Sequence, residues 1–113
     1  MVKINGDDWK IILTSSNHPA LLKPDNSYAL GCCDNKLKKI FITEGLTDAY
    51  FKKVISHELV HACMYSYDIE LDDYQEEILA DLIATYGNEI MNISNSIFCR
   101  LRGCKKNKGS LCY

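Results

Sequence analysis

The stretch His57-Glu58-Leu59-Val60-His61 constrains this chain more than any other, because it is an H-E-x-x-H motif inside a helical pattern. Residues four apart lie on one face of an α-helix, so both histidines can point at one metal ion. Glu58 is one position away and can reach a water on the same ion. Two imidazoles and a carboxylate at this spacing are typical of a zinc site with a general base. The alternative is a packed helix whose histidines are only hydrogen-bonded.

Strands are expected before the motif. Residues 9–14 are rich in β-branched and aromatic side chains, which predicts a first strand. Residues 28–33 and 37–43 flank a short polar stretch, Asp34-Asn35-Lys36, and this arrangement predicts a β-hairpin. Gly31 marks a bulge or a close approach of another part of the chain. The strand at 37–43 is a candidate sheet edge, along which an extended peptide could add as a further strand.

Two helices are expected after these strands. The first runs from an N-cap at Thr47 to about Tyr65, with apolar side chains recurring every four residues. The second covers about 74–91, and a continuation to 98 is left open. Short strands followed by helices predict an α+β fold, with a small antiparallel or mixed sheet of about three strands packed on two to three helices.

The start of the second helix contains several acids, each of which needs an explanation. Asp73 followed by Glu76 resembles a capping box, so capping is the expected role of Glu76. Glu77 and Asp81 are four residues apart and therefore share a face. The same helix has an apolar stripe and a strip of small residues, which are Leu79, Ile83, Tyr86 and Ile90, and Ala80, Ala84 and Gly87.

A catalytic zinc site has three protein ligands and a water, so the chain must supply a third ligand. The metzincin extension is absent, because Met64 and Tyr67 occupy the positions of its Gly and His. An acid on the second helix should then bind the metal. Glu77 is the expected ligand, with Glu76 and Asp81 as open alternatives. In that arrangement Asp81 is placed to accept the free N–H of a ligating histidine.

Three segments together resemble a known family. Residues 40–42, His57–Ala62 and Glu77–Ala84 look like a small gluzincin and are most similar to the ImmA/IrrE-type metallopeptidase domain of phages and mobile elements. That family pairs an H-E-x-x-H helix with a later helix of the form E-x-x-A-(N/D)-x-x-A. The resemblance covers about residues 28–90. The chain departs from the family pattern in its Cys-rich tail, residues 99–113, and in lacking a DNA-binding domain.

The resemblance implies a minimal zincin-like domain that hydrolyses a peptide bond in a protein or peptide substrate. It implies Zn²⁺ bound by His57, His61 and Glu77, with Glu58 as the general base. An additional transition-state stabiliser is expected among three tyrosines, Tyr65, Tyr67 and Tyr74. The alternative is a non-catalytic, zinc-stabilised module of phage or mobile-element origin that binds a protein partner.

The charge is unevenly distributed. Residues 99–113 carry +5, so the net charge of −2 puts −7 on residues 1–98. We therefore expect one domain over 1–98 and a basic tail over 99–113, and nucleic acid is not favoured as a partner because only the tail has the charge for it. No apolar run approaches the length of a membrane-spanning helix, and the N-terminus lacks a signal-peptide core, so a cytoplasmic protein is expected. The oligomeric state stays open.

The chain contains six cysteines, a high count for 113 residues. In a cytoplasmic protein they are expected to be reduced thiols. Cys63 lies on the apolar stripe of the first helix and is expected to pack in the core. Disulfides or a second, cysteine-based metal site are open alternatives for the others, Cys32, Cys33, Cys99, Cys104 and Cys112. The third histidine, His18, precedes a proline in a polar loop and is expected at the surface.

Overall fold

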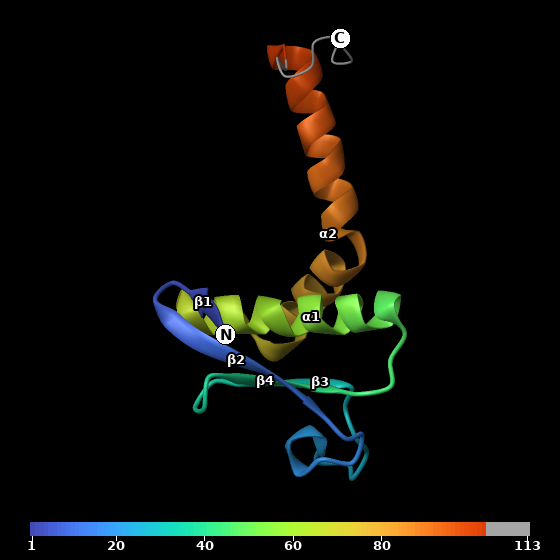
Figure 1. Ribbon diagram of the computed structural model, residues 1–113. Helices are drawn as coiled ribbons and strands as arrows, with labels where there is room; N and C mark the ends of the chain where they lie inside the picture. The colour runs from blue at the N-terminus through green and yellow to red at the C-terminus, as the bar shows by residue number, and fades with distance from the viewer. Residues whose placement is uncertain (104–113) are drawn as a thin grey trace.

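The computed structural model describes residues 1–103, which fold into an α+β domain with extents of 55 × 32 × 27 Å (Figure 1). The expected fold class is confirmed, although the mixed sheet has four strands instead of about three. The elements in chain order are β1 (Val2–Ile4), β2 (Asp7–Thr14), the 3-10 helix η1 (Pro19–Leu21), β3 (Gly31–Asp34), β4 (Lys39–Thr43), α1 (Asp48–Ser66) and α2 (Asp73–Arg102). The tail from residue 104 onward, with Cys104 and Cys112, lies outside the described residues.

The strand order in the sheet is β1-β2-β4-β3. The pairs β1–β2 and β3–β4 are antiparallel, whereas β2 and β4 are parallel. Because β2 covers one side of β4 and β3 covers the other, β4 is an interior strand. The prediction that residues 37–43 form an edge is therefore wrong, and the edges of this sheet are β1 and β3.

The hairpin of β1 and β2 was not expected from the strand patterns. Its turn is formed by Asn5 and Gly6, whose φ angles are 47° and 86°. Positive φ at both central residues matches the type I′ turn that two-residue hairpins favour, and Asn-Gly is the dipeptide most strongly associated with it. The turn dipeptide was thus the available signal, because a three-residue strand is too short to show alternation.

The main core lies between the sheet and α1. Trp9 of β2 and Ile40 and Ile42 of β4 are fully buried, and they pack with Val54 and Ala62 of α1. Burying a side chain of this kind contributes about 1.5–3 kcal/mol. Figure 1 shows α1 lying across this face of the sheet. The core therefore holds the motif helix in a defined position above the strands.

The opposite face of the sheet is covered near β4 by η1. Phe41 points to this face and stacks on His18, with ring centroids 5.5 Å apart. The His18 Nδ1 atom accepts the backbone N–H of Ala20 and so caps η1. His18 is half-buried rather than on the surface as expected, because the ring packs on Phe41 while capping the short helix.

The first long helix has the expected start. The Thr47 side chain accepts the backbone N–H of Tyr50 at 3.3 Å, which confirms it as the N-cap of α1. At the other end, the Ser66 Oγ atom accepts the indole N–H of Trp9 and donates to Asp7 Oδ2, both at 2.8 Å. These two hydrogen bonds fasten the end of α1 to β2.

The second helix begins one residue earlier than expected and is longer. Asp72 is its N-cap: the Asp72 side chain accepts the N–H of Gln75 at 2.8 Å, and the Gln75 side chain accepts the N–H of Asp72 at 3.4 Å. The predicted capping box of Asp73 and Glu76 is therefore wrong, because the Glu76 side chain does not cap the helix. The helix ends at Arg102, beyond both expected limits.

The packing of α2 on α1 involves its small residues. Ala80 is fully buried and packs with Val60 and Met64 of α1, together with Leu79. The three other members of the expected apolar stripe, Ile83, Tyr86 and Ile90, are exposed. Within residues 1–103, neither helix has the combination of length and apolarity that crossing a membrane requires.

Candidate metal centre

Three side chains from α1 and α2 converge on one point. The Nε2 atoms of His57 and His61, one turn apart on α1, are 3.2 Å from each other. The carboxylate of Glu77 on α2 lies 3.1 Å from Nε2 of His57 and 2.9 Å from Nε2 of His61. The structure therefore brings the motif histidines and the expected third ligand together in the geometry of a metal-binding group.

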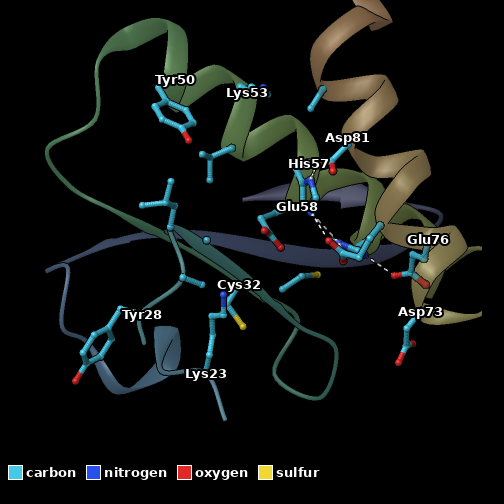
Figure 2. A pocket seen from close by; sticks show the side chains of 18 of the residues that line it. Lys23, Tyr28, Cys32, Tyr50, Lys53, His57, Glu58, Asp73, Glu76 and Asp81 are labelled. Atoms are coloured by element: carbon cyan, nitrogen blue, oxygen red, sulfur yellow. Dashed lines mark hydrogen bonds and ion pairs between the residues drawn. The ribbon is translucent and has the colours of Figure 1, made fainter. Parts of the chain in front are cut away.

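The outer nitrogens of both rings contact further carboxylates of α2. Nδ1 of His57 lies 2.9 Å from Oδ1 of Asp81, and Nδ1 of His61 is hydrogen-bonded to Oε2 of Glu76. Figure 2 shows His57 facing Asp81 across the gap between the helices. Ionised carboxylates only accept hydrogen bonds, so a proton at each Nδ1 satisfies these two contacts, and a neutral ring in that tautomer presents a lone pair at Nε2.

With Nδ1 protonated in both rings, the inner atoms of this group are of one electrostatic kind. The two Nε2 lone pairs and the Glu77 carboxylate are all electron-pair donors, and they face one another within 3.2 Å. Such groups repel unless positive charge lies among them. A metal ion supplies that charge, as does a second proton on an imidazole.

The donor set fits zinc. Bonds of about 2.0–2.1 Å in a tetrahedron place ligand atoms roughly 3.3 Å apart. Here the two Nε2 atoms are 3.2 Å apart, Oε1 of Glu77 lies 3.1 Å from Nε2 of His57, and Oε2 of Glu77 lies 2.9 Å from Nε2 of His61. With one ligand atom taken from each residue, all three lie within 4.8 Å of one another. Two imidazoles and one carboxylate also leave a fourth position for water, as catalytic zinc sites do. Within residues 1–103 these three residues form the one group of this kind, and it includes no cysteine.

Glu58 lies next to this group and is buried. Its side chain is part of the pocket wall, and Figure 2 shows its carboxylate pointing from α1 toward β3. Burial raises the pKa of the Glu58 carboxyl above its ordinary value, while His57 and His61 act to lower it and Glu77 to raise it. A buried carboxylate beside a candidate metal site is a strong proton acceptor, because few water molecules stabilise its charge.

A cavity of about 710 Å³ opens beside these groups, between α1, the start of α2 and β3. Figure 2 shows Tyr28 and Tyr50 at the end opposite Asp73 and Glu76. Lys23 and Lys53 also line the pocket, so it combines an acidic wall on α2 with basic and aromatic side chains elsewhere. Sequence reasoning did not assign these two lysines and two tyrosines to a pocket. Lys53 and Tyr50 lie on α1, four and seven residues before His57, so helical spacing was the available signal for them. No spacing links Lys23 and Tyr28, which lie on the loop before β3, to α1.

The three tyrosines that were candidates for a transition-state stabiliser differ in position. Tyr65 lines the pocket and stacks on Trp9, with ring centroids 6.4 Å apart. Burial raises the pKa of its phenol. Tyr67 and Tyr74 are exposed and are not part of the pocket wall. Only Tyr65 among the three is therefore close to the candidate metal centre.

Two cysteines of β3 also line the pocket. Burial raises the pKa of the Cys33 thiol to about 12 and raises that of Cys32. Both are free thiols, as is Cys63, which is half-buried on α1. Without a metal, Cys32 and Cys33 are therefore protonated at neutral pH and present weakly polar walls to the cavity.

Comparisons of this chain with protein-family models, with curated proteins and with solved structures gave no match.

Proposed function

We propose that this protein is a zinc-dependent metallopeptidase of the gluzincin type, which hydrolyses a peptide bond in a protein or peptide substrate. The observation that supports this most strongly is the convergence of His57, His61 and Glu77 beside the buried carboxylate of Glu58. The resemblance of the motif residues to ImmA/IrrE-type domains supports the same reaction class.

Glu58 is the general base in this proposal. A zinc ion held by His57, His61 and Glu77 would lower the pKa of a coordinated water to about 7 and would polarise the scissile carbonyl. The Glu58 carboxylate takes the proton of the attacking water and passes it to the leaving amine, a role worth typically about 10²–10⁴-fold in rate. The raised pKa of Glu58 suits this role, since it brings the carboxyl closer to the pH at which the protein works.

The residues around the ligands have separate tasks. Asp81 and Glu76 hold the rings of His57 and His61 in the tautomer that presents Nε2. They are positioning residues, since neither reaches the point where the three donors converge. Tyr65, in the pocket wall, is the proposed stabiliser of negative charge on the substrate carbonyl oxygen.

An extended substrate would lie along β3. This strand pairs with β4 on one side, and its other side pairs with no strand within residues 1–103. Unpaired backbone groups at a sheet edge can bind an extended peptide as an additional strand. Gly31, Cys32 and Cys33 of β3 line the pocket, so a peptide on this edge would pass Glu58. The proposed substrate strand is thus β3, and not β4 as the sequence suggested.

Metal stoichiometry is the first test. Protein purified without a metal-binding tag should contain one zinc per chain, and His57→Ala should contain none. His18→Ala is the matched control, because His18 lies on the other face of the sheet and should leave the zinc in place. A parent protein that holds no zinc after dialysis against the metal would exclude the proposed site.

Cleavage is the second test. Glu58→Gln should keep the fold and the zinc while lowering turnover by at least about 10²-fold. Turnover can be followed by mass spectrometry of a mixed peptide library and of unfolded protein substrates. Equal turnover by the parent and Glu58→Gln would contradict the role of Glu58 as general base. One zinc per chain without any cleavage would favour the alternative, a non-catalytic protein-binding module.

A further inference from the structure

The C-terminal part of α2 leaves the rest of the domain. Figure 1 shows the helix projecting beyond the layer formed by α1 and the sheet. From Asn88 to Gly103 every residue except the half-buried Cys99 is exposed. From Ile83 to Leu101, eight large apolar side chains of α2 are nevertheless exposed, namely Ile83, Tyr86, Ile90, Met91, Ile93, Ile97, Phe98 and Leu101. An apolar surface of this extent marks an interaction site.

Six of these side chains lie in one stripe. Ile83, Tyr86, Ile90, Ile93 and Ile97 follow one another at alternating spacings of three and four, and Leu101 continues the row. This is the a/d spacing with which one helix packs along another. The stripe, defined as these six residues, spans about 27 Å at 1.5 Å per residue. The shape that fits it is therefore a second helix of similar length.

The composition of this part of α2 also favours a packing partner. Between Ile83 and Leu101 the helix contains Gly87, several Asn and Ser residues and four isoleucines, all of which are weak helix formers. A helix of this composition is marginal in water without tertiary contacts. Packing of the stripe against a partner would supply the missing stabilisation.

The charges on α2 identify the partner and its orientation. The stretch from Asp72 to Glu89 contains acids and no base. The described residues of α2 after Glu89 contain Arg100 and Arg102 and no acid. A second copy running antiparallel brings the basic end of each helix beside the acidic half of the other. A parallel copy would place like charges together, which is unfavourable.

We infer that the stripe on α2 binds the same stripe of a second copy of this chain, and that the two helices run antiparallel. The dimer has the two globular domains at opposite ends of the helix pair. The stripe uses none of the residues that converge at the candidate metal centre, so this inference is independent of the proposed function.

Sedimentation velocity over a range of protein concentrations tests the association. The parent should shift from monomer to dimer with rising concentration, and Ile93→Asp should raise the dimer dissociation constant by at least about tenfold, as loss of a central interface residue does. Asn92→Asp is the matched control, because it adds the same charge on the polar face and should leave the constant nearly unchanged. A parent that stays monomeric throughout, or forms only higher oligomers, would overturn the inference.

Cross-linking tests the orientation. A photo-reactive phenylalanine analogue at position 101, in place of Leu101, should attach to residues 82–89 of the other copy. Mixing ¹⁴N- and ¹⁵N-labelled protein identifies links between copies by mass spectrometry. Links to residues 97–103 of the other copy would show a parallel pair, and links confined to one copy would contradict dimerisation. Unchanged zinc content of Ile93→Asp would separate this surface from the metal centre.

Discussion

Gly31 of β3 lies directly against Glu58 of α1: a Cβ atom at Gly31 would be 3.0 Å from Cγ and 3.2 Å from Oε2 of Glu58. The same atom would lie 2.9 Å from Cγ1 of Val54. Of the two roles expected for this glycine, a bulge or a close approach, the second is confirmed. The missing side chain lets the edge strand and the motif helix meet at the proposed general base.

Replacing this glycine should therefore damage both stability and catalysis. Gly31→Ala forces β3 or the Glu58 side chain to shift, and overpacking of this kind costs about 1–3 kcal/mol. Guanidinium unfolding should show that loss, and kcat/KM should fall while zinc binding persists. Gly87→Ala is the control, because its Cβ would meet only Ile83 at 3.4 Å; it should stabilise the helix by about 0.5–1 kcal/mol. Parent-like stability and turnover in Gly31→Ala would contradict the role of this contact.

The two positioning carboxylates should contribute unequally to metal binding. The side chain of Glu76 is 18% exposed and that of Asp81 is 70% exposed. Glu76→Ala leaves the N–H of the nearly buried His61 ring without a partner, whereas water can replace Asp81. Competitive titration with a zinc chelator should show a loss of about 10–100-fold in affinity for Glu76→Ala, and a smaller loss for Asp81→Ala. The reverse order would mean that Asp81 orients the site.

Glu58 should make the metal-free protein sensitive to pH. The pKa of its carboxyl is raised above 4.5 in the folded protein, so the folded state binds this proton more tightly than the unfolded chain does. The resulting stabilisation is complete below the unfolded pKa and is lost as the pH rises through the folded pKa. Glu58→Gln cannot ionise, so it should be more stable than the parent at pH 7 without metal.

The test of this pH dependence is urea unfolding in a chelator at several pH values. The difference in the free energy of unfolding between Glu58→Gln and the parent should shrink as the pH falls. It should be lost below about pH 4, where Glu58 is protonated in both the folded and the unfolded parent. A difference in the free energy of unfolding that grows toward low pH would contradict the raised pKa.

The hydrogen bond between Trp9 and Ser66 should be important for folding. The Trp9 ring is fully buried, and its N–H donates to Ser66 Oγ at 2.8 Å. Ser66→Ala leaves this donor without an acceptor, which costs about 1–3 kcal/mol. In a Trp9→Phe background the same change should cost less, because the donor is gone. Equal costs in both backgrounds, measured by chemical unfolding, would show that the bond contributes no coupling.

The helices show what local pattern can determine. Thr47 and the four-residue apolar spacing predicted α1 nearly to its ends, because capping and helical periodicity depend on residues within one or two turns. The α+β class followed from the order of the segments in the same way. The cap of α2 was placed one residue late, since Asp72 and Asp73 are chemically equivalent and only the backbone bonds to Gln75 distinguish them.

The sheet shows where local pattern ends. The segment at 37–43 has the composition of a strand, but its place in the sheet depends on parallel pairing with β2, about 30 residues earlier in the chain. No feature within the segment predicts that pairing, so the strand that was expected at an edge lies in the interior of the sheet. The edge beside the pocket is formed by β3, whose Gly31 contacts Glu58.

By itself the sequence determined that one helix presents His57, Glu58 and His61 together, because the spacing of residues along a helix sets the directions in which their side chains point. It also limited the remaining ligand to the acids at the start of α2. Only the tertiary structure decided which of these acids faces both Nε2 atoms. The packing of Ala80 on α1 sets how α2 is rotated and how closely it approaches, and this brings Glu77 to both Nε2 atoms. Three acids on neighbouring positions of one helix cannot be ranked until the helix it packs against is known.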